Sequence, residues 1–79
     1  MKKIAPKIII DPEIRFGKPI IKGTRITVEE ILGALAGGMD FKEIEKEYGV
    51  KKEDILAVIK YAASFLKGVE IKLPKSVKV

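Results

Sequence analysis

The sequence predicts a mainly α-helical fold, in which a short N-terminal β-hairpin precedes a three-helix core and an extended C-terminal tail. Three observations support this prediction. Thr27 and Asp40 are each followed three residues later by Glu, which is the spacing of a capping box at a helix start. Gly49 divides a stretch whose apolar residues recur with the helical period. Before Thr27, β-branched residues alternate with Pro and Gly, as in short strands joined by turns.

Residues 1–26 are expected to form the β element. The run KIII at residues 7–10 is rich in β-branched residues and is typical of a strand, which the following Asp-Pro pair ends. Residues 18–26 are expected to form a hairpin or a bent extended segment. Its turn falls at Lys22 and Gly23, where Gly23 supplies the positive φ angle.

Residues 27–67 are expected to form three helices. The first begins after Thr27 and ends at residues 37–38, and its buried stripe is Val28, Ile31, Leu32, Leu35 and Ala36. The second begins after Asp40 and ends at Gly49, because Gly takes the left-handed conformation there without a steric penalty. The third begins near Lys52 and runs to about Lys67.

The second and third helices have the spacing of a helix-turn-helix, the two-helix unit of winged-helix and homeodomain-like proteins. The apolar residues form facing stripes: Ile44 and Tyr48 on the second helix, and Ile55, Val58, Ile59 and Ala62 on the third. Val50 is expected to fill the angle between the two helices. The same spacing also fits a plain helical corner in a small bundle, so the pattern alone does not separate the two interpretations.

Composition limits the class of protein. The 79 residues are expected to form a single domain, near the size below which one core is insufficient, so a homodimer is expected. The absence of Cys fits a reducing cytoplasm, and no apolar run is long enough to span a membrane. Because His is absent too, no base stands ready to activate a hydroxyl nucleophile; we expect no enzymatic activity, no metal and no cofactor.

The net charge of +5 is unevenly placed along the chain. Residues 40–67, which include the helix-turn-helix, carry six basic and six acidic groups, whereas residues 1–39 carry seven basic and four acidic groups. Neutralisation of phosphates supplies most of the affinity of DNA-binding proteins. A DNA-binding surface therefore has to draw its positive potential from the N-terminal segment, the tail or a second subunit.

The tail, residues 68–79, alternates apolar and basic residues. Its apolar side in an extended conformation consists of Ile71, Leu73, Val77 and Val79. Pro74 excludes a central strand. Since an extended segment cannot bury this side alone, we expect it to add to a sheet edge, in another chain or in its own; the alternative is a frayed terminus.

Five blocks of the sequence form a distinctive set: IDPE at residues 10–13, FGKPIIKGTRI at 16–26, LAGGM at 35–39, EDI at 53–55 and YA at 61–62. Over about residues 8–66 the chain resembles the domain family of unknown function numbered four-three-three. The resemblance implies an antitoxin of the VapB type, from a type II toxin–antitoxin pair. It also implies a small β element, a DNA-binding-like core and a C-terminal segment that engages a nuclease of the PIN type. Where relatives usually cap the third helix with Thr or Ser, this chain has Lys51.

These observations favour a homodimeric, DNA-binding repressor of the antitoxin type. Its third helix is expected near the major groove, with Lys51, Lys52 and Lys60 contacting phosphates or base edges. Lys22 and Arg25 are expected to contact the DNA backbone beside it. The tail residues are expected to bind the toxin.

The alternative is a protein-interaction module, in which a neutral helical core dimerises and the tail captures a partner without significant DNA binding. Leu56 shares a helix face with Lys52 and Lys60, and suits either a partner or the methyl groups of DNA. Phe16, in a loop between basic residues, is placed for stacking on a base, whereas the helical spacing of the other aromatic residues makes them core or interface residues first.

Overall fold

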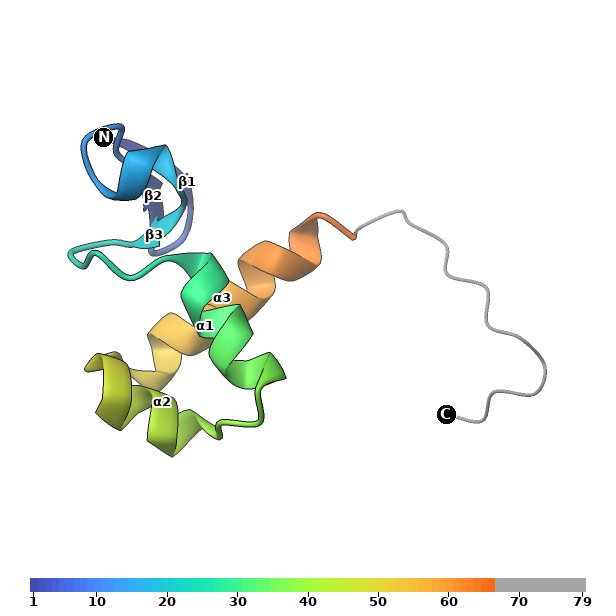
Figure 1. The fold of residues 1–79 in the computed structure, drawn as a ribbon. Coiled ribbons are helices and arrows are strands. Elements are labelled where there is room, and N and C mark those ends of the chain that lie inside the picture. Colours follow the sequence, from blue (N-terminus) through green and yellow to red (C-terminus); the bar gives the residue numbers. More distant parts are fainter. Residues whose placement is uncertain (67–79) are drawn as a thin grey trace.

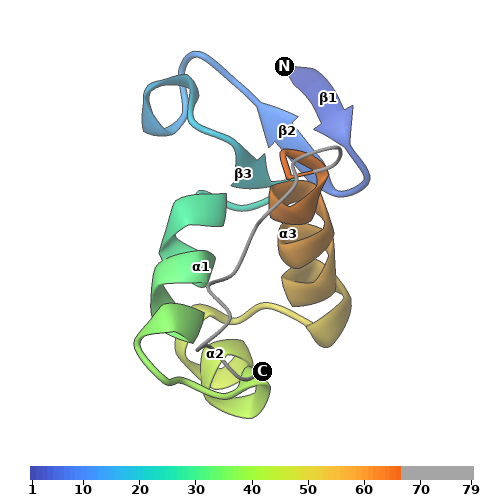
Figure 2. The same ribbon diagram turned by 90° about the vertical axis from the view of Figure 1, so that its right-hand side faces the viewer.

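The computed structural model describes residues 1–66. Helices α1 (Val28–Ala36) and α3 (Lys52–Ser64) pack side by side. A three-stranded antiparallel sheet lies at one end of this pair, and α2 (Phe41–Tyr48) closes the other end (Figures 1 and 2). The prediction of an N-terminal β element followed by three helices is confirmed.

The sheet has the strand order β1, β2, β3, with bounds Lys2–Ala5, Ile8–Ile10 and Ile20–Ile21. Ile8 of β2 pairs with Ile21 of β3, and Ile9 pairs with Ile20. Strand β1 was not predicted, because its exposed Lys2 and Lys3 hide the alternation of a half-buried strand. The β element is therefore a three-stranded sheet rather than a simple hairpin.

The turn after β3 has the predicted form. Gly23 lies at φ +82°, and the backbone N–H of Ile21 donates to the carbonyl of Ile26 at 2.9 Å across the turn. The hydroxyl of Thr24 bridges the same loop: it donates to the carbonyl of Ile21 at 2.8 Å and accepts from the N–H of Ile26 at 3.0 Å. This loop leads directly into α1.

Both predicted capping boxes are present. The Thr27 hydroxyl accepts from the N–H of Glu30 at 3.0 Å and the Glu30 carboxylate accepts from the N–H of Thr27 at 3.1 Å; Asp40 and Glu43 make the equivalent pair. Helix α3 ends at Ser64 rather than near residue 67, because its last backbone bonds tighten to the carbonyls three residues back. Within residues 1–66, no helix has the length and apolar character needed to cross a membrane.

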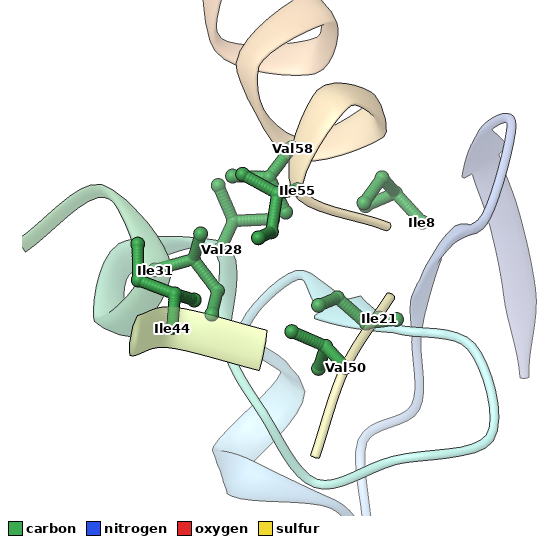
Figure 3. Close-up of a cluster of buried hydrophobic side chains, with 8 residues drawn as sticks. All are labelled: Ile8, Ile21, Val28, Ile31, Ile44, Val50, Ile55 and Val58. Carbon is green, nitrogen blue, oxygen red and sulfur yellow. The ribbon is translucent and has the colours of Figure 1, made fainter. Parts of the chain in front are cut away.

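One core joins the sheet to all three helices (Figure 3). Its members are Ile8 and Ile21 from the sheet, Val28 and Ile31 from α1, Ile44 from α2, Val50 from the turn, and Ile55 and Val58 from α3. One member of the predicted α1 stripe is wrong: Ala36 is exposed. The buried residues of α1 are Val28 and Ile31, and the half-buried Leu32 and Leu35 pack against the same core, whereas Ala36 lies on the outer side of the last turn.

Candidate nucleic-acid interface

Helices α2 and α3 are joined by the tight turn that a helix-turn-helix requires. Gly49 closes α2 at φ +69°, and its N–H donates to the carbonyl of Glu45 at 2.9 Å. Val50, directly after it, is buried, and Ile44 and Ile55 are fully buried on the facing sides of the two helices. Because the inner face of α3 is committed to the core, its opposite face is turned outward.

The outward face of α3 carries the three residues that helical spacing predicted to share one face. Lys52, Leu56 and Lys60 are all exposed, with Leu56 at 39% of its full exposure. Leu56 and Lys60 line one wall of a groove of about 450 Å³, and Pro6 and Lys7 of the β1–β2 turn form the other wall. The turn of the sheet therefore stands beside α3 along its outward face.

Lys7, which sequence analysis did not single out, is the basic residue that this turn brings to α3. Its Nζ atom lies 3.3 Å from Oδ1 of Asp54, and Oδ2 of the same carboxylate accepts from the backbone N–H of Lys51 at 3.0 Å. The carbonyl of Lys7 accepts from the N–H of Lys22 at 2.8 Å. Lys7 and Lys51 thus contact the same carboxylate in the first turn of α3, and Lys22 adjoins Lys7 through the backbone.

Asp54 replaces the missing cap at the start of α3. Lys51 makes no side-chain cap, but Asp54 accepts from its backbone N–H and binds Lys7, so a neighbouring element holds this helix end. Acidic residues in a first helical turn also complement the helix dipole. Glu53, in contrast, borders the groove and remains exposed, so one negative charge sits among the lysines.

Two of the predicted DNA contacts lie away from the start of α3. Lys60 is two turns along the helix, and Arg25 lies in the loop before α1, where its carbonyl accepts from Nη1 of Arg15 at 2.9 Å. Within the described part of the chain, all five residues are exposed and form no ion pair: Lys22, Arg25, Lys51, Lys52 and Lys60. The tail residues predicted to bind a partner, Ile71, Leu73, Val77 and Val79, lie outside the described residues.

Glu30 of α1 binds the two segments that flank Arg25, through hydrogen bonds to Thr27 and an ion pair with Arg15. The Glu30 carboxylate accepts from the backbone N–H and the hydroxyl of Thr27, both at 3.1 Å, and pairs with the guanidinium of Arg15. The hydrogen bond from the Thr27 backbone, helped by Arg15, holds the pKa of Glu30 below its ordinary value, although partial burial acts in the opposite direction. The carboxylate form is therefore the one that fastens the loop.

The 3₁₀ turn η1 (Arg15–Gly17) presents the aromatic residue that the sequence placed for stacking. Phe16 is 97% exposed. The turn is left-handed throughout, at φ 50°, 59° and 78°, which costs roughly 1–2 kcal/mol for each residue other than Gly. The turn lies on the side of the sheet away from α3, as the blue segment in Figure 2 shows.

The candidate interface shows no cluster of metal-ligating side chains within the described residues. Among residues 1–66, no group of three or more acidic, His or Cys side chains is close enough to hold a metal ion. The arrangement consists of a helix-turn-helix, a flanking β-turn whose Lys7 pairs with Asp54, and exposed lysines that form no ion pair within residues 1–66. Such a surface is suited to binding a polyanion.

Comparison with known proteins identifies the family of this chain. Residues 8–62 match the family described as "Protein of unknown function (DUF433)", and the chain belongs to this family. A crystal structure of a DUF433 member protein from Anabaena variabilis superposes with a TM-score of 0.70 and 29% identity, covering 77% of this chain and 61% of that chain. The fold is therefore that of the family.

A relative with a named role is found in Mycobacterium tuberculosis (strain ATCC 25618 / H37Rv). The protein named "Putative antitoxin VapB45" is 29% identical to this chain over 48 residues, which are 61% of this chain. The match covers 20% of that protein, so this chain corresponds to one part of a longer relative. The similarity to a protein named as an antitoxin agrees with the resemblance in the sequence.

Proposed function

We propose that this protein is the DNA-binding antitoxin of a type II toxin–antitoxin pair, acting as a homodimeric repressor whose tail engages a PIN-type nuclease. The observation that carries the proposal is the outward face of α3, which the core leaves free and at whose start Lys7, Lys51 and Lys52 lie. The second helix of a helix-turn-helix reads the major groove with residues near its N-terminus. In this protein the lysines gather at the same end of α3.

In the proposed complex, α3 enters the major groove. Lys51, Lys52 and Lys60 contact phosphates or base edges, and Glu53 lies close to bases rather than phosphates, because a carboxylate accepts from cytosine but is repelled by the backbone. Leu56 lies between Lys52 and Lys60, where it meets thymine methyl groups. The mixed charge of α3 then favours sequence discrimination over general attraction.

The β1–β2 turn acts beside α3 as a small wing. Lys7 and Lys22 are linked through their backbones, and Lys7 reaches the first turn of α3 through Asp54. We propose that these two lysines, together with Arg25 on the adjoining loop, contact the DNA backbone and fix the register of α3. Part of the positive charge missing from the helix-turn-helix itself is thus supplied by the N-terminal segment.

The affinity of purified full-length protein for duplex DNA from upstream of its own reading frame tests the repressor role. Fluorescence anisotropy should show binding that weakens in Lys7→Ala, Lys51→Ala and Lys52→Ala variants. Lys2→Ala is a matched control, because it removes one exposed lysine at the end of β1 away from the Lys7 turn. If Lys2→Ala weakens binding as much as the other three variants do, the loss of affinity follows from the lower net charge and not from contacts at α3. If the unaltered protein does not bind DNA, the repressor role is overturned.

The tail is tested separately by removing residues 67–79. We expect the truncated protein to keep its fold, because the core lies within residues 1–66, and to lose capture of a co-expressed PIN-type nuclease. Full capture by the truncated protein would contradict the proposed role of the tail.

A second candidate function is a protein-interaction module without DNA affinity. It is favoured by the apolar groove along α3, in which the exposed Leu56 side chain faces the β1–β2 turn. A partner helix or strand in this groove would cover the same lysines. Partner binding that is lost in Leu56→Asp, with no DNA binding by either protein, would support this candidate over the repressor.

A further inference from the structure

The groove along α3 extends to the point where the described part of the chain ends. Its apolar lining residues come from both walls: Ala5, Pro6, Leu56, Ala57 and Tyr61. Ser64, in the last turn of α3, also lines the groove, and only Phe65 and Leu66 separate it from residue 67. The chain that follows Leu66 therefore starts at one end of this groove.

Apolar side chains are exposed where the chain leaves α3. Phe65 is 66% exposed and Leu66 is 59% exposed. The ring of Phe65 packs edge-on against Tyr61, which lines the groove, with the two ring centroids 5.0 Å apart. Leu56, further back along the groove, is exposed too. Residues 1–66 thus leave uncovered an apolar surface that continues from the groove to the end of α3.

The sequence after Leu66 contains an apolar segment of matching length. Gly68 and Pro74 bracket the five residues VEIKL, in which apolar and charged side chains alternate. Five extended residues span about 17 Å. The α3 residues that line the groove run from Glu53 to Ser64, which is also about 17 Å along a helix. Residues 69–73 are therefore long enough to fill the groove as one extended segment, with their charged side in water.

Gly68 suits a reversal of the chain after α3, because Gly takes the backbone conformations of tight turns at no steric cost. An extended residue covers about twice the rise of a helical residue. A segment running back from Gly68 therefore brings Ile71 to the level of Lys60 and Leu73 to the level of Leu56. Pro74 follows directly and ends the regular alternation.

Charge is complementary in this antiparallel order. Lys60 and Glu53 both line the groove, and neither forms an ion pair within residues 1–66. The reversed segment brings Glu70 to the half of the groove that holds Lys60, and Lys75 to the end that holds Glu53. Lys7, the other charged lining residue, is already paired with Asp54. Opposite charges in matching order fix the direction of a docked segment.

Covalent attachment favours this segment over a separate molecule. A segment joined to a site by a short flexible linker is present there at an effective concentration in the millimolar range. A separate partner of equal intrinsic affinity has to reach that concentration in solution to compete. The tail of a second copy has no such advantage unless the chain dimerises first.

We propose that residues 69–73 dock in the groove of their own chain, with Ile71 and Leu73 against Leu56, Ala57 and Tyr61. This contact goes beyond the proposed function, which assigns the tail to a partner nuclease, and it does not depend on DNA binding. One consequence does rest on the proposed function. Because the docked segment covers Leu56 and borders Lys60, it competes with DNA for the outward face of α3.

Disulfide trapping tests the docked position. The chain has no Cys, so full-length variants that combine Ala57→Cys with one Cys in the tail contain only the introduced thiols. Leu73→Cys and Lys72→Cys are a matched pair, because neighbouring residues have equal reach in an undocked tail. Oxidation should form the intramolecular bond roughly fivefold faster with Leu73→Cys, since neighbours in an extended segment point to opposite sides. Equal rates for the two variants would overturn the proposal.

Amide chemical shifts of the full chain test how far the segment reaches. A variant with both Ile71→Ser and Leu73→Ser keeps the net charge of the tail. Its signals should differ from those of the unaltered protein at Lys7 and Leu56, which are distant in sequence from the substitutions, and should agree at Gly33 on the outer side of α1. A variant with both Val77→Ser and Val79→Ser, outside the docked segment, should leave Lys7 and Leu56 unchanged.

Affinity for duplex DNA tests the consequence for function. The variant with Ile71→Ser and Leu73→Ser should bind DNA several-fold more tightly than the unaltered protein, because it uncovers α3 without changing the charge. Equal affinity of the two proteins would contradict the competition between the tail and DNA.

The remaining outcomes separate docking from its alternatives. Disulfides that form mainly between chains would assign the groove to the tail of a second copy and overturn docking within one chain. Unchanged shifts at Lys7 and Leu56 would leave the groove to a separate partner and overturn it too. If the unaltered protein binds no DNA but the Leu73→Cys bond forms preferentially, the repressor role falls and the docked tail is supported.

Discussion

Arg15 and Glu30, fifteen residues apart in the sequence, form the ion pair that fastens η1 to the first turn of α1. The same carboxylate completes the capping box with Thr27. One side chain therefore stabilises a helix end and positions the loop that presents Phe16. Substitutions of Glu30 should affect both the stability of the fold and the geometry of the loop.

We expect the contribution of Glu30 to stability to depend on pH. Its pKa in the folded state is lowered, chiefly by the Thr27 backbone N–H, so folding favours the charged form. The contribution is complete above the ordinary value of 4.5 and is lost as the pH falls from there through the lowered folded-state pKa. Urea unfolding between pH 7 and pH 3 should show a smaller acid-induced loss in Glu30→Gln than in the unaltered protein. An identical pH profile would contradict this assignment.

Two glycines provide a matched test of the helix-turn-helix bend. A Cβ at Gly49 or at Gly33 meets nothing within 4 Å, so Ala substitutions there differ only in backbone conformation. Gly49→Ala should destabilise the fold by roughly 1–2 kcal/mol, because Gly49 is left-handed. Gly33→Ala, within α1, should stabilise it by about 0.5–1 kcal/mol. Denaturant unfolding measures both, and similar effects of the same sign would show that the bend is not determined by Gly49.

Neighbouring residues on α3 distinguish its inner face from its outer face. Ile55 is fully buried, whereas Leu56 is 39% exposed. Ile55→Ala should cost about 2–5 kcal/mol of unfolding free energy, through lost burial and the cavity left behind. Leu56→Ala should cost much less, since its side chain lies in an open groove. A larger loss for Leu56→Ala in chemical denaturation at fixed protein concentration would mean that α3 is rotated from the described orientation.

Local signals in the sequence were sufficient to predict the helices. The Thr27 and Asp40 boxes and the left-handed Gly49 depend on neighbours within a few residues, and all three are confirmed. Strand β1 was missed, because an edge strand with exposed lysines carries no apolar alternation. The predicted end of α3 was too late, because a gradual 3₁₀ ending has no sequence signal as strong as a cap.

The candidate site was predicted less completely than the fold. The common face of Lys52, Leu56 and Lys60 follows from helical spacing, and all three are exposed. The approach of Lys7 to Asp54 joins residues 47 positions apart, and depends on how the β1–β2 turn packs against α3. No periodic pattern encodes a contact of this kind. The DNA-binding roles of these residues remain predictions.

The salt dependence of DNA affinity tests the proposed function most directly. Anisotropy titrations from low to physiological salt should give an affinity that falls log-linearly, with a slope close to 0.9 for each phosphate contacted. The slope should decrease by about one in Lys7→Ala and in Lys52→Ala, and should not change in Lys2→Ala. An affinity that is absent at low salt, or a slope equal in all four proteins, would contradict the proposal that α3 and its flanking turn bind DNA.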